Sequence, residues 1–264
     1  MARVRIRRRS LQTLLSIDSH QAYHAHLFRE ALDPYLEDCK RAGREPGHVL
    51  AIGAGWREAE ALATYPFQRV VLSGILEPDE RIQAATARHP RLTYELANAE
   101  ALPYAGSSFD LVLCKESLHH LPRPALGLYE MLRVCRHRAV FLEPWDCAVL
   151  AGFDRLGLTT RFERNLDANL QGRDNFVYRW SARGIESLLA SYYIDSGERA
   201  EVDVGWLSTR ILMARTPRVR KALLAAGWAM SWLPGGLGNH ATVALVPGEN
   251  RPADPAPVSE IPGF

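Results

Sequence analysis

Short apolar runs alternate with helix-like segments in the middle of the chain, and this alternation limits the fold more than any other feature. The runs cover residues 48–52, 69–72, 92–97, 109–114 and 139–142. Segments with helical periodicity lie between them, and one of these begins at a proline, which favours the first turn of a helix. Buried strands that alternate with helices form βαβ units, in which the strands run parallel. The pattern therefore predicts an α/β fold built on a parallel sheet.

The N-terminal part of the chain, residues 1–45, is predicted to be an arm followed by a helix over 18–42. The arm is basic, and its arginines are Arg3, Arg5, Arg7, Arg8 and Arg9. Charged chain ends without a hydrophobic pattern are commonly solvated and poorly ordered, so that is the expectation for this arm. A surface that meets anionic lipid or substrate, or a transit-like segment, is the alternative.

Residues 46–246 are predicted to form the main domain, with less regular inserts at 145–180 and 206–238. A helix is expected over 181–191, and two short strands near 202–204 and 241–246 are expected to close the sheet as a hairpin-like pair. The tail, 247–264, is rich in proline and is expected to be extended or disordered.

The composition of the chain limits which binding partners and which cellular location are expected. The chain has 32 basic and 30 acidic residues, a net charge of +2, so the overall charge gives no reason to expect a nucleic-acid partner. No C-x-x-C pair occurs among Cys39, Cys114, Cys135 and Cys147, which argues against a zinc site and favours free thiols in the cytoplasm. No apolar run reaches the roughly 18 residues of a transmembrane helix.

The first candidate site is the turn between the strand at 48–52 and the helix that follows it. Gly53 and Gly55 allow a tight turn and a close approach of a ligand, because no Cβ stands in the way. Parallel sheets bind ligands at the carboxyl ends of their strands. A glycine turn between a strand and a helix is common, so this signal alone is weak.

A more specific string follows from Asn98 to Leu121. It resembles the middle of class I S-adenosylmethionine-dependent methyltransferases that act on small molecules, a family with an L-P-F…S-F-D-x-V…L-H-H-L pattern. The matching positions here are Leu102, Pro103 and Tyr104, then Ser108, Phe109, Asp110 and Val112, then Leu118, His119, His120 and Leu121, with Glu130–Val134 and Glu143–Pro144 beyond them. The resemblance covers roughly residues 46–146 and is weak elsewhere.

The resemblance implies a Rossmann-like sheet of seven strands, mainly parallel, with helices on both faces, and S-adenosylmethionine as the methyl donor. The residues at cofactor-binding positions are Gly53, Ala54, Gly55, Glu77, Asn98, Ala99 and Cys114. His119 and Glu143 are the candidate catalytic residues, since a histidine at that edge of the sheet has a pKa suited to deprotonating a hydroxyl. No metal site is expected.

The chain departs from the family pattern at four positions. Ala51 replaces an acid before the turn, Arg57 replaces the third glycine, Glu77 lies displaced from the position of the acid that binds the ribose, and Asn98 replaces an aspartate near the adenine. Three hypotheses follow: an active methyltransferase with an adapted pocket, an inactive methyltransferase fold that serves as a binding or assembly protein, and the same fold with a different ligand.

The expected acceptor is a small molecule methylated on oxygen. Its expected contacts come from the two inserts, which provide aromatic surface for an apolar or lipid-like molecule, although core packing explains most of these side chains equally well. They are Trp145, Phe153, Phe162, Tyr178, Trp180, Trp206, Trp228 and Trp232.

Overall fold

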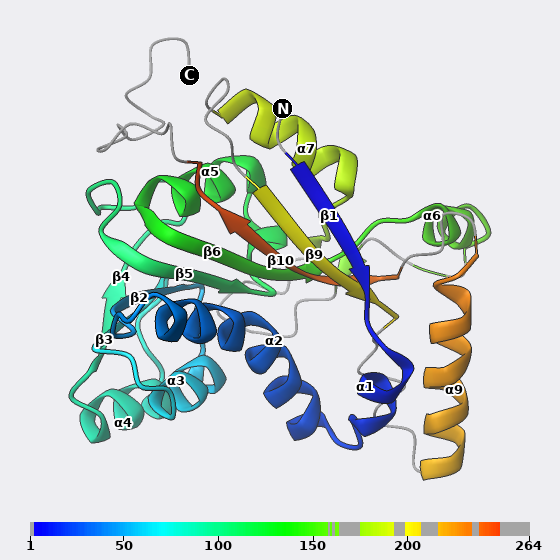
Figure 1. Ribbon diagram of the computed structural model, residues 1–264, viewed down its shortest axis with the longest axis horizontal. Coiled ribbons are helices and arrows are strands. Elements are labelled where there is room, and N and C mark those ends of the chain that lie inside the picture. The colour runs from blue at the N-terminus through cyan, green and yellow to red at the C-terminus, as the bar shows by residue number, and fades with distance from the viewer. Residues whose placement is uncertain are drawn as a thin grey trace.

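An eight-stranded sheet forms the centre of the protein (Figure 1). The computed structural model describes residues 3–157, 159, 162–163, 175–192, 199–206, 216–233 and 238–248. In spatial order the strands are β1 (Arg3–Arg8), β9 (Arg199–Gly205), β10 (His240–Val246), β6 (Cys135–Pro144), β5 (Phe109–Lys115), β2 (His48–Ile52), β3 (Arg69–Gly74) and β4 (Leu92–Leu96). The predicted fold class is confirmed, with one strand more than the seven expected.

The chain reverses its direction across the sheet between β2 and β5. From β2 it proceeds outward to β3 and β4, then returns to β5 on the other side of β2 and continues to β6. Neighbours in this group pair in parallel, and β10 is antiparallel to both β6 and β9. At such a reversal the connections leave on opposite faces, which opens a crevice at the carboxyl ends of the two central strands.

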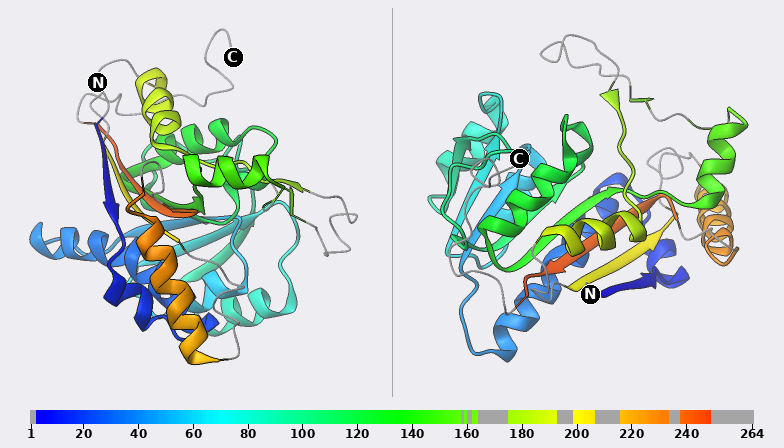
Figure 2. Two further views of the ribbon diagram at one scale, coloured as in Figure 1. Left: turned by 90° about the vertical axis from the view of Figure 1, so that its right-hand side faces the viewer. Right: turned by 90° about the horizontal axis from the view of Figure 1, so that it is seen from above.

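Helices cover both faces of the sheet, as Figures 1 and 2 show. One face carries α2 (His20–Arg41), α3 (Trp56–Ala63) and α4 (Glu80–Arg88), and the other carries α5 (Pro124–Val134) and α7 (Ala182–Tyr192). Successive residues of each strand point to opposite faces. Val49 and Ala51 therefore join the core under α2, whereas Leu50 and Ile52 join the core under α5.

The basic arm forms strand β1 and is not the poorly ordered terminus that was expected. Its residues pair with β9 in parallel from Arg3↔Arg199 to Arg8↔Val204. Val4 and Ile6 pack against the core of the α5 face, while the arginine at position 5 between them is exposed. This alternation of apolar and charged residues is the period of a strand with one buried face.

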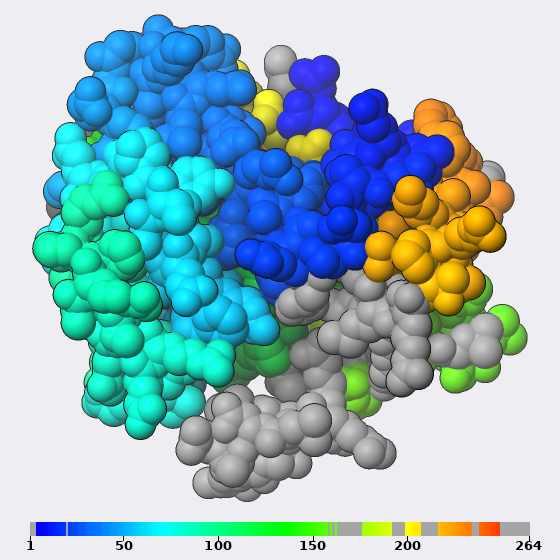
Figure 3. Space-filling model, turned by 90° about the horizontal axis from the view of Figure 1, so that it is seen from below, coloured from blue at the N-terminus to red at the C-terminus, as the bar shows by residue number. Residues whose placement is uncertain are grey.

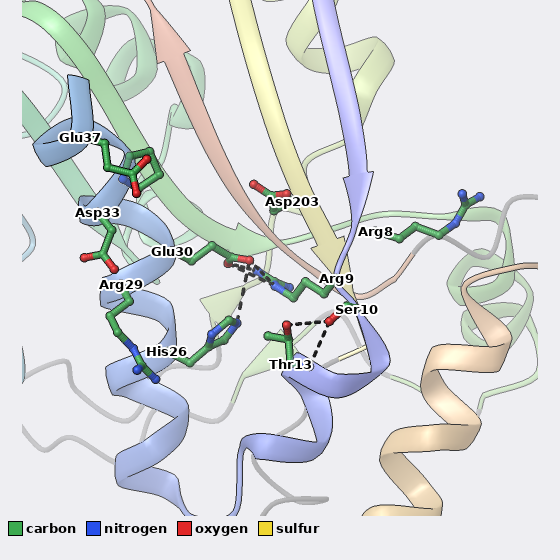
Figure 4. A pocket seen from close by; sticks show the side chains of 11 residues that line it. Arg8, Arg9, Ser10, Thr13, His26, Arg29, Glu30, Asp33, Glu37 and Asp203 are labelled. Atoms are coloured by element: carbon green, nitrogen blue, oxygen red, sulfur yellow. Dashed lines mark hydrogen bonds and ion pairs between the residues drawn. The ribbon is translucent and has the colours of Figure 1, made fainter. Parts of the chain in front are cut away.

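Arg9, directly after β1, anchors the strand to the rest of the sheet (Figure 4). Its side chain is only 1% exposed and donates to both carboxylate oxygens of Glu30 on α2, at 2.6 Å for the shortest contact. It also donates to the carbonyl of His240 and the hydroxyl of Thr242, both on β10. One guanidinium thus connects β1, α2 and β10.

The inserts pack at one end of the molecule. Helix α1 (Leu11–Ser16) lies beside α9 (Pro217–Met230), and α2 separates this pair from α3 and α4 in Figure 3. The first insert contains α6 (Ala148–Arg155) and the short strands β7 (Phe162–Glu163) and β8 (Asn175–Phe176). In the described part of the chain, no helix combines the length and the apolar character needed to cross a membrane. The tail from 249 onward lies outside the described residues.

Replacing Arg9 tests how much this anchor stabilises the fold. Arg9→Met leaves the buried Glu30 carboxylate without its countercharge, and breaking a buried ion pair costs about 3–5 kcal/mol. We expect a loss of that size in the free energy of unfolding measured in urea. Arg5→Met is the matched control, because Arg5 is an exposed arginine on β1, the strand that Arg9 follows, and it should change the stability by less than about 0.5 kcal/mol. Equal effects of the two variants would contradict the role of Arg9.

Candidate active site

The glycine turn lies at the reversal of strand order, between β2 and α3. Gly53 has a φ of +60°, in the left-handed region that favours glycine. A Cβ at this position would lie 2.6 Å from the Cβ and Oγ of Ser117, which follows β5. The amide of Ala54 donates to the carbonyl of Ser73 at the end of β3, so this strand also holds the turn. The sequence prediction of a tight turn is confirmed.

The amide of Gly55, at the start of α3, is hydrogen-bonded within the protein. It donates to Oε2 of Glu58 at 2.9 Å, an arrangement that caps the first turn of the helix. The other oxygen, Oε1, lies 3.4 Å from Nζ of Lys115 at the end of β5. A carboxylate therefore occupies the positive end of the helix dipole, and it connects the turn to the neighbouring strand.

Lys115 continues this connection to Glu116. Its Nζ donates to Oε2 of Glu116 at 2.8 Å, and its side chain is only 6% exposed. Burial lowers the pKa of Lys115, but the charges of Glu116 and Glu58 outweigh it, so the net shift is upward. Burial likewise opposes ionisation of Glu116, but the charge and hydrogen bond of Lys115, together with the nearby histidines, outweigh it and lower the pKa of Glu116 to about 2. Both groups are therefore charged at neutral pH.

Glu143, at the end of β6, holds the turn that follows β5. Its Oε1 accepts the amides of Ser117 and Leu118 at 2.8 Å each, and its Oε2 lies 2.5 Å from Nδ1 of His119. His119 and Glu143 are thus brought together, as a catalytic pair would require. Their side chains are 3% and 1% exposed, so a catalytic role for either remains a prediction.

Cys114 lies inside β5 with no exposed surface. Burial, followed by the nearby charge of Glu143, raises the pKa of its thiol well above the ordinary value. The thiol is therefore protonated at neutral pH, and a protonated thiol is a poor nucleophile. Any contact of this residue with a ligand would come from its backbone.

Exposed apolar side chains stand at the carboxyl ends of β3 and β4. Ile75 is 69% exposed, Leu76 is 44% exposed and Leu96 is 52% exposed. Nearby, the hydroxyl of Tyr94 donates to the carbonyl of Leu76 and lies less than 3.0 Å from the place that a Cβ on Gly74 would take. The predicted Glu77 follows directly and is also exposed. This edge combines apolar surface with one carboxylate.

The loop after β4 contains the other predicted cofactor residues. Asn98 is exposed, and its Oδ1 accepts the amide of Glu100 at 3.0 Å. Ala99 is buried, with 6% of its surface exposed. Both follow β4, so the structure places them at the same edge as the glycine turn and Glu77, and their contacts with a cofactor remain predictions.

Several residues at this edge were not identified from the sequence. Strand order brings together Glu58, Glu116, Ser117 and His240. The glutamate three residues after Gly55 carries a recognisable helix-capping spacing. The others required knowledge of which strands are neighbours.

The predicted aromatic surface divides between core and solvent. Trp145 and Trp180 are each 1% exposed, and the two residues form a backbone bridge, so they belong to the core. Phe162 is 55% exposed and Trp232 is 60% exposed. A contact of these two side chains with an acceptor remains a prediction.

Comparisons with known proteins agree with this architecture. Residues 50–142 match the family model described as "Methyltransferase domain". A 27-O-demethylrifamycin SV methyltransferase from Amycolatopsis mediterranei is 31% identical over 116 residues, which cover 42% of this chain and 40% of that protein. The chain thus matches less than half the length of this relative.

Two solved structures resemble the fold. The YcgJ protein from Bacillus subtilis has a TM-score of 0.52 at 17% identity, covering 80% of this chain and 96% of its own. A protein from Galdieria sulphuraria, assigned as a sarcosine dimethylglycine methyltransferase, has a TM-score of 0.52 at 14% identity, covering 89% and 91%. At these identities the likeness shows the fold, and the family match confirms the predicted resemblance to methyltransferases over residues 50–142.

Two glycines with the same backbone conformation allow a test of the turn. Gly43 has a φ of +61°, and no atom lies within 4 Å of the place that a Cβ would take there, whereas a Cβ on Gly53 meets Ser117 at 2.6 Å. Gly43→Ala should cost only the left-handed strain, about 1–2 kcal/mol. Gly53→Ala should cost more in urea unfolding, because Ser117 must also move. Equal losses of unfolding free energy for the two variants would show that the contact with Ser117 does not affect the stability.

Proposed function

We propose that this chain, whose residues 50–142 are a class I methyltransferase domain, transfers a methyl group from S-adenosylmethionine to an oxygen atom of a small molecule. The observation that carries the proposal is the glycine turn at the reversal of strand order, next to the string from Leu102 to Leu121 that defines the resemblance. When bound, the cofactor supplies a methyl group that its sulfonium already activates. The protein's part is positioning and electrostatics.

The described residues fit such a cofactor. The left-handed backbone of Gly53 and its close approach to Ser117 fix the turn at the carboxyl end of β2, where a parallel sheet binds ligands. Ile75, Leu76 and Leu96 offer exposed apolar surface to a base, and Glu77 lies beside them as a carboxylate for ribose hydroxyls. Asn98 offers its side-chain amide at the same edge.

Glu58 and Glu116 compensate for the acid that is missing at Ala51. Ala51 is buried in β2 and carries no charge. The carboxylates of Glu58 and Glu116 carry two negative charges, and the ammonium of Lys115 carries one positive charge. This group of three therefore has a net charge of −1 beside the turn. The methionine end of S-adenosylmethionine carries a cationic amine, for which this excess is the complementary charge. The altered motif is therefore compatible with binding.

His119 and Glu143 act, in this proposal, as positioning residues. Both are buried, and both oxygens of Glu143 are engaged by the turn after β5. Their pairing fixes the backbone of Ser117 and Leu118 at the edge where the cofactor binds. Residues that hold the reacting partners in place contribute to rate through geometry.

An oxygen acceptor is supported by the Amycolatopsis relative, whose name specifies methylation of an oxygen. The exposed Phe162, Phe176 and Trp232 support an apolar or lipid-like body for the acceptor, and the acceptor itself remains a proposal. The cysteines at positions 39, 114, 135 and 147 are free, which supports a location in the reducing cytoplasm.

Calorimetry with S-adenosylhomocysteine tests the proposal directly. This product keeps the cationic amine and the adenosine of the cofactor, so we expect it to bind the full chain. No heat of binding at millimolar ligand, with the protein folded by circular dichroism, would overturn the enzyme assignment. That result would favour the alternative of an inactive methyltransferase fold that serves as a binding or assembly protein.

The role of the excess charge gives a sharper prediction. Glu58→Gln removes one carboxylate but keeps an oxygen that can cap Gly55. We expect the Kd for S-adenosylhomocysteine to rise about tenfold or more, the value of one charge-assisted hydrogen bond. Binding of methylthioadenosine, which has no amine, should be unchanged.

Glu60→Gln is the matched control for this experiment, because Glu60 is an exposed glutamate on the same helix. It should leave both dissociation constants as they are. Equal weakening of both ligands by Glu58→Gln would mean that the carboxylate shapes the turn and does not bind the amine.

A further inference from the structure

We propose that Glu116 and His240 form the subsite for the methyl acceptor, and that this subsite takes a neutral hydroxyl group. The proposal rests on the proposed function and specifies its substrate class. Glu116 directly follows β5, and His240 is the first residue of β10, which pairs with the end of β6 at Pro144. Strand order therefore brings both residues to the edge that holds the glycine turn.

His240 is a buried polar side chain whose two ring nitrogens accept or donate no hydrogen bond within the described part of the chain. It is 6% exposed, and neither Nδ1 nor Nε2 has a hydrogen-bond partner among the described residues. A buried polar group without a partner costs about 1–3 kcal/mol, so its presence calls for an explanation such as a ligand or an ordered water.

The backbone of Glu116 is left-handed, directly after the end of β5. Its φ is +51°, a conformation that non-glycine residues rarely adopt and that often marks functional sites. Its amide donates to the carbonyl of Leu142 on β6, which keeps it in the sheet. The side chain is 35% exposed, so a ligand can reach it. Its Oε2 is bound by Lys115, which leaves Oε1 facing His240.

The distance between the two residues fits one bridging oxygen. Oε1 of Glu116 lies 4.0 Å from Nε2 of His240, too far for a direct hydrogen bond. Two hydrogen bonds of about 2.8 Å can meet at a single atom placed beside this gap. A hydroxyl is suited to that position because it donates to the carboxylate and accepts from the imidazole N–H at the same time.

The charges of the two groups select against other ligands. Burial, and then the charge of Arg9, lowers the pKa of His240 to about 3, so the ring is neutral and offers one N–H and one lone pair. Glu116 is ionised. An anionic oxygen would be repelled by this carboxylate, and an ammonium would leave the imidazole N–H without an acceptor when Nε2 carries the proton. A neutral hydroxyl satisfies both groups.

The subsite is connected to the cofactor site by charged contacts. Glu116 is paired with Lys115, which contacts Glu58, and Glu58 caps the amide of Gly55. The cationic side of the pair therefore faces the glycine turn, and the free oxygen faces His240. A hydroxyl held at this free oxygen is next to the edge where the methyl donor is proposed to bind.

Nuclear magnetic resonance of the full chain, labelled with ¹⁵N-histidine and saturated with S-adenosylhomocysteine, tests this subsite. The probes are phenol, anisole, which has no hydroxyl proton, and benzoate, which is anionic. We expect phenol to shift the ring-nitrogen signals of His240 in a saturable manner, and anisole and benzoate to leave them in place. The His240→Gln spectrum assigns the signals.

Glu116→Gln supplies the second variant, because its partly exposed site tolerates an amide of equal size. It should raise the Kd for phenol about tenfold or more, and Glu60→Gln should not. Absence of a phenol shift, as when the pair holds an ordered water only, would overturn the subsite, and so would equal shifts with anisole. Failure of S-adenosylhomocysteine to bind would count against the proposed function alone, since phenol can be titrated into the free protein.

Discussion

The reversal of strand order between β2 and β5 is the constraint on which the rest of the structure depends. Because these strands are parallel neighbours, their carboxyl ends open at one edge, and the segments that leave them diverge to opposite faces. The glycine turn leaves β2, while Lys115 and the residues after it leave β5. Two polar contacts connect the segments that diverge here: Nζ of Lys115 lies 3.4 Å from Oε1 of Glu58, and Oγ of Ser117 donates to the carbonyl of Gly53.

Charged side chains connect the segments at this edge of the sheet. They matter more for the geometry of the site than for the stability of the fold. Buried ion pairs gain little net stability, because desolvation offsets the attraction. Lys115 is nonetheless buried between two glutamates, and both carboxylate oxygens of Glu143 contact the turn after β5. Such groups fix a geometry that apolar packing would leave adjustable. The strained backbone at Glu116 fits the same account, since strain persists where the surroundings determine the conformation.

Local sequence patterns predicted the parallel strands at the centre of the sheet. The strand that they missed depends on pairing between distant parts of the chain. The five central strands and the helices between them follow from apolar runs and turn residues, which are local signals. Strand β1 was missed because four arginines dominate its composition, although Val4 and Ile6 alternate with them in the period of a strand. That alternation gains meaning only when β9, far along the chain, is available as a partner.

The same reasoning applies to the altered cofactor motif. Judged within its own motif, Ala51 removes a negative charge and suggests a weakened site. In the fold, Lys115 contacts two carboxylates beside the same turn. One belongs to Glu58, seven residues after Ala51, and the other to Glu116, which follows the neighbouring strand β5. A binding site selects for the charge at a position in space and not for the residue that carries it. The proposed compensation is invisible to a linear motif, because it requires both the helix cap and the order of the strands.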